Sequence, residues 1–425
     1  MENNIDTVSK EKTEVTQNNN NSSNEKPKEE PNSKKQILNL IITKSVKCSK
    51  STLSKAGKFI ESILSMDKPR LKELSAQGLP DDLPILRSLI WKINLGYLTL
   101  NSEEWTNTLQ SQRKTYNIYK ALFISKLKEE IKLFNDYHTK SKSEKKKIEE
   151  GTNKTLLEDI AKDVNRTHMQ FSFFFQPTNK KTKMTQEEIK EMVENRRNCT
   201  MRDIKDTYKI DINETHADVI ARILFIYSKF SPDVSYVQGM NEIIAPIYYC
   251  FSYDKLYEEE NENDIEADTF WTFYLLMQKM KYVFNREEDK TDAGITGKAL
   301  RLELLVSLVD KEIYTHFGKY KLDFSLFAFR WFILIFSQDF LMIDILRLWD
   351  FIFSEEDIFK NVYCVSLAIM LMKKDTILVS DLTGMIEELQ NLGGLDIESL
   401  VNNAIKIRQV YGEKIDEIIK NEYIM

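Results

Sequence analysis

The segment Ile220–Asp233 reads IARILFIYSKFSPD and determines the fold class. Its large apolar residues recur at three- and four-residue spacing, and they include Ile220, Ile223, Leu224 and Tyr227. This spacing places them on one face of a helix. Ser231-Pro232-Asp233 follows and ends the helix, because proline cannot continue the backbone hydrogen bonding. The segment therefore predicts an amphipathic helix with one buried face.

The same pattern extends along the chain in both directions. Upstream, Leu156, Ile160 and Val164 form a stripe at four-residue spacing. Downstream, apolar runs typical of helices cover Phe329–Phe336, Leu341–Phe353 and Val362–Met372. The sequence shows neither alternating strand and helix patterns nor a series of hairpins, and it has only 12 Gly and 8 Pro in 425 residues. We predict an all-α protein.

Composition restricts the class of function. The formal net charge of −6 argues against nucleic acid as the main partner, because phosphate binding needs a basic face. The cysteines Cys48, Cys199, Cys250 and Cys364 lack the spacing of a zinc site or a disulfide framework. Without a signal peptide or an apolar run of about 18 residues, the sequence predicts a soluble cytoplasmic protein.

The N-terminal region divides into two predicted parts ahead of the main body. Residues 1–35 are polar and we expect them to be disordered, because they lack apolar surface to bury. Residues 36–58 form a basic amphipathic extension. Its helical part, Ile37–Lys58, favours packing of the apolar side on the body, and contact with an anionic membrane is the alternative. The body is expected to cover residues 59–425.

Three polar stretches are predicted to be loops: Lys140–Gly151, Asn179–Lys205 and Asp254–Asp268. The third contains eight acidic residues opposed only by Lys255. A charge run of this kind usually lies in a solvated loop, and a docking site for a partner is the less favoured alternative.

The sequence offers no self-contained active site. Gly294–Lys298 only faintly resembles a phosphate-binding loop, since two residues separate its glycines and Ala299 replaces the magnesium-binding Ser or Thr. A nucleophile elbow, a zinc signature and a kinase catalytic loop are all missing. We therefore expect neither a cofactor nor a metal of the protein's own.

Three short segments carry the functional information when they are read together. They are Arg87-Ser88-Leu89-Ile90-Trp91-Lys92-Ile93-Asn94-Leu95-Gly96-Tyr97-Leu98, Ile160-Ala161-Lys162-Asp163-Val164-Asn165-Arg166-Thr167 and Tyr236-Val237-Gln238-Gly239-Met240-Asn241. Each of them alone has an ordinary structural explanation as part of an amphipathic helix or a helix start. Their joint occurrence in this order is the informative observation.

In this order the segments resemble the three signature motifs of the TBC domain of Rab GTPase-activating proteins. Phe327–Trp331 and Leu346–Asp350 are similar to the aromatic-rich C-terminal part of that domain. The resemblance runs from about Phe59 to the C-terminus and implies a bilobed, multi-helix, all-α fold. Three further segments point to one member of the family in particular, and they are Arg222–Tyr227, Ala267–Phe270 and Gly294–Thr296.

The resemblance implies that the protein activates GTP hydrolysis by a GTP-bound Rab, to which GTP and magnesium belong. Arg166 would reach the phosphates, and Gln238 would position the attacking water. These residue types suit the tasks, because a guanidinium forks around phosphate oxygens and an amide both donates and accepts hydrogen bonds. The protein would then not be an enzyme in its own right, but would regulate vesicle trafficking from the cytoplasm or from endomembranes.

Six other residues of the motifs are expected to support this pair: Asp163, Tyr236, Gly239, Asn241, Arg87 and Trp91. Asp163 precedes Arg166 by three positions on a helix, so its carboxylate is expected to orient the guanidinium, with an ordinary exposed pair as the alternative. Gly239 leaves room for close backbone approach, and Tyr236 is expected to pack beneath the loop. Arg87 and Trp91 are interpreted mainly as scaffold.

The segment after Arg166-Thr167 departs from the family pattern, since it continues His168-Met169-Gln170-Phe171. The departure removes neither Arg166 nor Gln238. The alternative function is a catalytically silent TBC protein that binds Rab GTPases or acts as a scaffold. Such a protein would be expected to lack one member of the pair, and this chain has both.

Overall fold

The structure is a computed structural model that describes residues 39, 41–44, 47–135, 152–168, 171–178, 214–253 and 262–420. All of these belong to one compact unit, Ser33–Met425. The predicted disordered tail of residues 1–35 and the predicted loops Lys140–Gly151 and Asn179–Lys205 lie outside the described residues.

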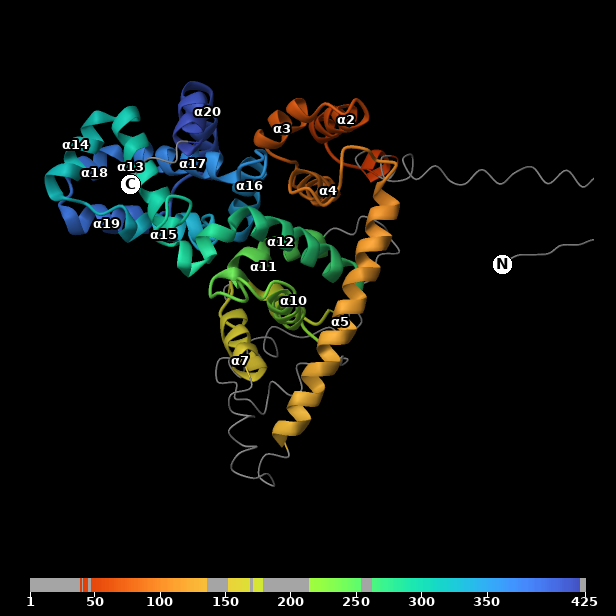
Figure 1. Ribbon diagram of the computed structural model, residues 1–425. Coiled ribbons are helices and arrows are strands. Elements are labelled where there is room, and N and C mark those ends of the chain that lie inside the picture. Colours follow the sequence, from red (N-terminus) through yellow and green to blue (C-terminus); the bar gives the residue numbers. More distant parts are fainter. Residues whose placement is uncertain are drawn as a thin grey trace, which may run out of the picture. The chain divides into compact units, whose positions relative to one another are not determined.

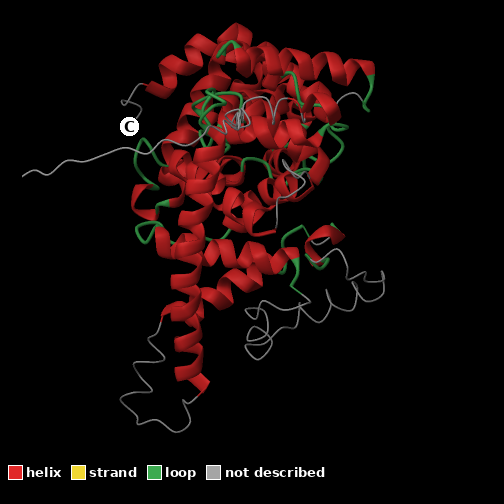
Figure 2. Cartoon of the chain, turned by 90° about the vertical axis from the view of Figure 1, so that its right-hand side faces the viewer, coloured by secondary structure: helices red, strands yellow, loops and turns green. Residues whose placement is uncertain are grey.

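The prediction of an all-α fold is confirmed. The described residues form helices and no β-strand, as Figure 2 shows, apart from an isolated bridge between Pro177 and Thr215. The helices are α2 Lys50–Leu64, α3 Lys68–Ala76, α4 Pro84–Asn94, α5 Trp105–Asn135, α7 Thr152–Val164, η2 Ser172–Phe175, α10 His216–Phe230, α11 Met240–Tyr253, α12 Glu262–Phe284, η3 Arg286–Glu288, α13 Ile295–Val309, α14 Lys311–Tyr320, α15 Ser325–Leu334, α16 Met342–Ile352, α17 Ile358–Met372, α18 Lys374–Val379, α19 Leu382–Gln390 and α20 Ile397–Lys420.

Helix α10 contains residues 220–230 of the segment that predicts the fold class. It begins with a capping box in which the Thr215 hydroxyl accepts from the Asp218 backbone N–H and the Asp218 carboxylate accepts from the Thr215 N–H. It ends at Phe230, immediately before Ser231, as the Ser-Pro-Asp sequence predicts. Most of α10 is buried, because it packs against α7, α11 and α12 (Figure 1). It is therefore a central helix that positions the segments on either side of it.

The C-terminal apolar runs form α15, α16 and α17, close to their predicted bounds. Trp331 and Trp349 are fully buried in the core. Helix α15 ends at Leu334, two residues earlier than predicted, because Ile335 and Phe336 both adopt left-handed backbone conformations with φ of 42° and 64°. Such conformations are costly for large side chains, and the surrounding structure must hold them in place.

The predicted loop at Asp254–Asp268 is wrong for the residues that the structure describes. Residues 262–268 form the first turns of α12, and Glu266 and Asp268 are buried there. Glu266 binds Arg222 of α10 and Lys120 of α5, each at 2.7–2.8 Å. Although burial alone would raise it, these cations lower the pKa of Glu266 to about 2.

Asp268 is held in the same way by cations from other helices. Its carboxylate accepts hydrogen bonds from Lys92 at 2.7 Å, Tyr97 at 2.8 Å and Arg113 at 2.8 Å. Burial alone would raise the pKa of Asp268, but the charges of Lys92 and Arg113 outweigh this effect and lower it. The charge pattern predicts a loop wrongly here because the cations that pair with Glu266 and Asp268 are distant in the sequence. A local pattern contains no information about such partners.

Arg87 and Trp91 of α4 meet at one buried carboxylate. The Asp350 side chain, 0% exposed, accepts from Arg87 Nε at 3.0 Å, Trp91 Nε1 at 2.9 Å and the Leu79 backbone N–H at 2.9 Å. Asp350 belongs to α16, so the cluster ties the N-terminal helices to the C-terminal ones. The prediction that Arg87 and Trp91 serve as scaffold agrees with these contacts.

We expect Asp350→Ala to lower the free energy of unfolding by about 3–5 kcal/mol, because it removes the buried carboxylate that Arg87 and Trp91 share and leaves Arg87 only an ion pair with Asp81, whose side chain is 72% exposed. Chemical denaturation followed by circular dichroism measures the loss. Glu398→Ala is the matched control, since it breaks the Arg347–Glu398 ion pair, in which the Glu398 side chain is 59% exposed. The control is expected to lose less than about 1 kcal/mol, and equal losses would contradict this account of Asp350.

The described part of the basic extension packs on the body. Ile41 is fully buried, and α2 buries Thr52, Ala56 and Phe59 while Lys55 and Lys58 stay exposed. The hydroxyl of Thr52 donates to Asp82 at 2.7 Å, which attaches the start of α2 to the chain before α4. Packing of the apolar side is therefore confirmed for these residues, and membrane contact through residues 37–58 stays a prediction.

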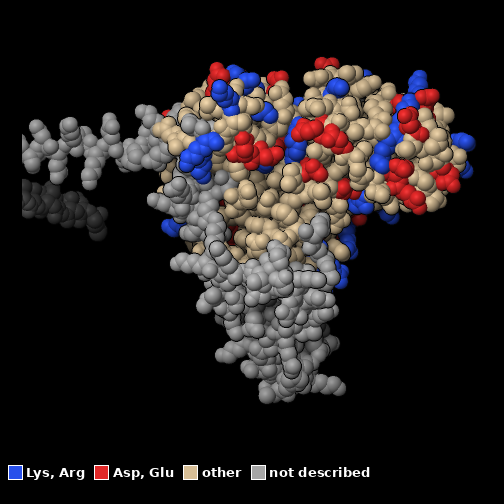
Figure 3. Space-filling view, turned by 180° about the vertical axis from the view of Figure 1, so that it is seen from behind, with Lys and Arg blue, Asp and Glu red and all other residues tan. Residues whose placement is uncertain are grey.

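The surface of the described residues carries charges of both signs. On the face seen in Figure 3, Lys and Arg are interspersed with Asp and Glu. Within the part of the chain that the structure describes, no helix combines the length and the apolar character needed to cross a membrane.

Candidate functional site

Arg166 lies in the turn that follows α7. Ile160 and Val164 anchor the last turns of the helix in the core, with 0% and 3% of their surfaces exposed. The chain then tightens, and the backbone N–H groups of Arg166 and Thr167 donate to the carbonyls of Asp163 and Val164 at 3.0 and 3.1 Å. The Arg166 side chain is exposed, and no hydrogen bond or ion pair within the described chain engages its guanidinium.

Gln238 lies in the loop between α10 and α11. Two left-handed residues shape this loop, Ser235 with φ of 57° and Gly239 with φ of 103°. The N–H of Gly239 donates to the Asn241 side-chain oxygen at 3.1 Å, and the N–H of Met240 donates to the carbonyl of Val237 at 3.1 Å. The loop backbone is thus held from both sides, while the Gln238 side chain is exposed.

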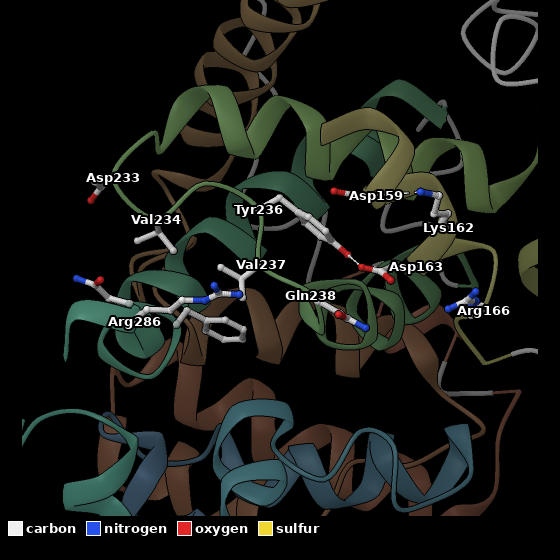
Figure 4. Close-up of a pocket in the computed structure, with 12 residues that line it drawn as sticks. Asp159, Lys162, Asp163, Arg166, Asp233, Val234, Tyr236, Val237, Gln238 and Arg286 are labelled. Carbon is white, nitrogen blue, oxygen red and sulfur yellow. Dashed lines mark hydrogen bonds and ion pairs between the residues drawn. The ribbon is translucent and has the colours of Figure 1, made fainter. Parts of the chain in front are cut away.

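Both side chains line one open pocket of about 650 Å³, drawn in Figure 4. The α7 helix and its turn, the α10–α11 loop and the end of α12 form its wall. The lining residues are Asp159, Lys162, Asp163, Arg166, Asp233, Val234, Tyr236, Val237, Gln238, Phe284, Asn285 and Arg286. The structure therefore brings together the two residues that the motifs single out.

Among the described contacts, no hydrogen bond or ion pair joins the side chains of Asp163 and Arg166, although the charge of Arg166 acts to lower the pKa of Asp163. The expected orienting role of Asp163 therefore stays a prediction. Arg166 lies beyond the end of α7, in the turn, so the three-residue spacing no longer places both side chains on one helix face. The Asp163 carboxylate accepts a hydrogen bond from the Tyr236 hydroxyl at 2.7 Å, across the pocket wall (Figure 4). Asp163 connects the α7 segment to the Gln238 loop, and Tyr236 is its partner.

Asn241 completes the connection between the two segments. Its side-chain N–H₂ donates to the Thr167 hydroxyl at 2.8 Å and to the Asp163 carbonyl at 3.3 Å, while its oxygen accepts from Gly239. The Thr167 hydroxyl in turn donates to the Asp163 carbonyl at 3.1 Å. One amide thus holds the residue after Arg166 and the residue after Gln238, which limits how far the two side chains can move apart.

Burial sets the protonation of the groups beneath the pocket. It raises the pKa of the Asp163 carboxyl, although the hydrogen bond from Tyr236 acts in the opposite direction. It also raises the pKa of Tyr236, so the phenol stays a hydrogen-bond donor at neutral pH. Burial raises the pKa of Glu242 to about 7 and lowers that of His168 to about 4. His168 is therefore neutral, and Glu242 can carry a proton near neutral pH.

Sequence reasoning missed several residues of the pocket. Asn285 and Arg286 follow α12, and Asp233 precedes the third motif. These residues show no periodicity or motif, and only the packing of α12 against α10 and α11 brings the end of α12 to the pocket. Arg87 and Trp91, which belong to the first motif, are not among the pocket's lining residues and lie in the Asp350 cluster.

Comparisons with known proteins agree with the arrangement of motifs. Residues 176–378 match the Rab-GTPase-TBC domain, a range that includes Gln238 and begins after Arg166. TBC1 domain family member 13 from Homo sapiens is 29% identical over 376 residues, covering 80% of this chain and 93% of that protein. This is the member of the family to which the sequence pointed.

A second relative has a solved structure. GTPase-activating protein GYP1 from Saccharomyces cerevisiae is 24% identical over 345 residues, covering 76% of this chain and 43% of that protein. The crystal structure of the Ypt/Rab-GAP domain of Gyp1p matches with a TM-score of 0.60 at 21% identity, covering 85% of this chain and 100% of that chain. The two chains share a fold. This chain is thus similar to proteins that carry the Rab-GTPase-TBC domain.

Proposed function

We propose that this protein is a GTPase-activating protein for Rab-type small GTPases and supplies Arg166 and Gln238 to the partner's active site. The observation that carries the proposal is their shared position: two exposed side chains from separate segments line one open pocket. The relatives named above, a TBC1 domain protein and a GTPase-activating protein, support the same activity.

The chemistry of GTP hydrolysis explains why this pair is useful. Negative charge develops on the phosphate oxygens in the transition state, and a guanidinium supplied in trans stabilises it. The attacking water also needs orientation, which an amide provides without competing for protons. The partner brings GTP and magnesium, so the protein acts as an activator and not as an enzyme with its own substrate site.

The pocket is held in a way that suits such a role. The contacts of Asp163 with Tyr236 and of Asn241 with Thr167 are buried or half-buried beneath the two exposed side chains. The partner would therefore meet side chains whose backbone is already fixed, which reduces the entropy lost on binding. A silent Rab-binding protein would not need both reactive residues exposed together, so activation is the favoured proposal.

The proposed setting is vesicle trafficking, with the protein cytoplasmic and recruited to endomembranes where its GTP-bound Rab is located. Exposed Lys55 and Lys58 of the basic extension would favour an anionic surface. This part of the proposal is independent of the catalytic chemistry.

Single-turnover GTP hydrolysis across a panel of purified Rab GTPases tests the activity. We expect the full chain to accelerate hydrolysis on at least one GTP-loaded Rab. If wild type binds a Rab without accelerating hydrolysis on any member of the panel, the silent alternative is correct.

Gly239→Ala is expected to lower activation through the position of Gln238. A Cβ at this residue would lie 2.9 Å from Leu334 Cδ2, so either the Leu334 side chain or the loop must shift, and φ of 103° adds backbone strain that favours a shift of the loop. A misplacement of about 1 Å costs up to roughly 10²-fold in rate. We expect kcat/KM to fall by at least about tenfold in the single-turnover assay.

Gly96→Ala is the matched control for this substitution. Gly96 has a similar φ of 90°, but nothing lies within 4 Å of its Cβ position. Both variants should therefore lose about 1–2 kcal/mol of stability from backbone strain, and only Gly239→Ala should lose activity. Equal activities in the two variants would contradict a role for the close approach at Gly239.

A further inference from the structure

His168, two residues after Arg166, is held in an unusual position. Its φ of 42° is left-handed, a conformation that is uncommon for residues other than glycine, although histidine adopts it more often than most. Its side chain is only 4% exposed, and its ring lies nearly parallel to that of Phe174, with centroids 6.0 Å apart. The conformation of the turn that carries Arg166 therefore depends on the contacts that keep His168 buried.

The ring of His168 faces one acidic side chain. Its Nε2 atom is buried without a hydrogen-bond partner and lies 3.5 Å from Oε2 of Glu242, whose side chain is 8% exposed. Glu242 is in the first turn of α11 and also accepts from Asn241 Nδ2 at 3.2 Å. A buried imidazole nitrogen without a hydrogen-bond partner is costly, and a hydrogen bond to the adjacent Glu242 carboxyl group would remove that cost.

The charges around this pair allow one shared proton. Burial and the negative charge of Asp163 raise the pKa of Glu242 to about 7, with hydrogen bonds from Gln338 and Asn241 opposing them. Burial lowers the pKa of His168 to about 4, so the imidazole is neutral. A protonated Glu242 donates to Nε2, and an ionised Glu242 accepts from the other imidazole tautomer. Either arrangement joins the two residues by one hydrogen bond.

We propose that His168 and Glu242 form a buried hydrogen-bonded pair that positions Arg166 relative to Gln238. The pair connects the turn after α7 to the first turn of α11, where Glu242 also accepts from Asn241. It rests on the proposed function, because its purpose is to keep the two exposed side chains at one separation. Glu242 and His168 are positioning residues that act through Arg166.

Two substitutions at Glu242 separate this role from mere packing. Glu242→Met keeps the length of the side chain but removes its hydrogen bonds, while Glu242→Gln keeps a donor and an acceptor. On a Rab that wild type stimulates, Glu242→Met is expected to lower kcat by about 10- to 100-fold with little change in KM. Glu242→Gln is expected to retain kcat within about threefold. Equal losses of kcat in the two variants overturn the proposal.

The route through Arg166 is tested by combining substitutions. In an Arg166→Ala background the position of residue 166 no longer matters, so Glu242→Met should cause less than about a twofold further loss of kcat. If the loss from Glu242→Met is the same in both backgrounds, Glu242 acts independently of Arg166 and the proposal fails. Equal circular dichroism spectra and melting temperatures show that each variant is folded.

Nitrogen-15 NMR of the imidazole side chains tests the pair without any GTPase. In the free protein, the His168 Nε2 resonance is expected to shift on Glu242→Met and to stay near its wild-type position on Glu242→Gln. His316 serves as an internal control, because its Nε2 contacts the Ser380 carbonyl in another part of the fold. If the His168 resonance does not shift on Glu242→Met, the two residues do not form a hydrogen bond and this proposal fails, even if the protein activates a Rab. If the expected shift is seen but the protein activates no Rab, the proposed function is refuted and the hydrogen-bonded pair is not.

Discussion

Arg166→Ala is expected to lower kcat/KM for Rab-stimulated GTP hydrolysis by about 10³–10⁵-fold, the range associated with an arginine supplied in trans. The effect is large because the guanidinium meets charge that develops only in the transition state. The fold should be unaffected, since the side chain is exposed and no partner within the described residues depends on it. Single-turnover hydrolysis measures the rate, and the melting temperature measures the fold.

Two further variants make this result specific. Arg166→Lys keeps the charge but cannot fork around two phosphate oxygens, so it should recover little of the lost rate. Arg70→Ala removes an arginine that pairs with Glu61 on the surface and lies outside the pocket's lining residues. It should change kcat/KM by less than about threefold. If Arg166→Ala resembles Arg70→Ala on a Rab that wild type stimulates, Arg166 does not stabilise the transition state.

Gln238→Ala is expected to lower kcat by about 10²–10³-fold, the range found when one preorganised polar group is removed from an active site. The loss should fall mainly on kcat and not on KM, because positioning of water matters in the chemical step. Gln238→Asn should be nearly as inactive, since it retains the amide but withdraws it by one methylene group. Stopped-flow detection of phosphate release measures both variants against wild type.

The partner GTPase offers a second test of Gln238. If this residue takes over the positioning of water, a Rab whose own catalytic glutamine is replaced by alanine should still be stimulated within about tenfold of the wild-type Rab. Gln238→Ala should then abolish stimulation of that Rab variant. Loss of all stimulation with wild-type protein would show instead that the Rab glutamine does the work, and that Gln238 has another role.

Local patterns were enough to predict the helical class and several helix bounds. The stripe of α10 and the Ser-Pro-Asp sequence that ends it depend on spacing and on proline chemistry, which act within a few residues. The sequence also singled out Arg166 and Gln238, because three motifs read together are more specific than any single residue, and both side chains line one pocket. Gly239 is a local case as well, since a left-handed φ favours glycine.

Local patterns failed where partners come from distant segments. The acidic run reads as a solvated loop, yet Glu266 and Asp268 are buried against cations from α4, α5 and α10. The three-residue spacing of Asp163 and Arg166 reads as a helical pair, yet α7 ends between them and Asp163 accepts its hydrogen bond from Tyr236. In both cases the hydrogen-bond partner comes from a segment that is distant in the sequence.

The sequence by itself determined that this chain is all-α and that it carries motifs similar to those of a TBC domain, and it singled out Arg166 and Gln238. These conclusions follow from helical periodicity and from short motifs. Only the tertiary structure decided what holds the two residues together: Asp163 with Tyr236, Asn241 with Thr167, and Glu242 facing His168. The physical reason is that hydrogen bonding and burial depend on distance in space, and chain order does not record that distance.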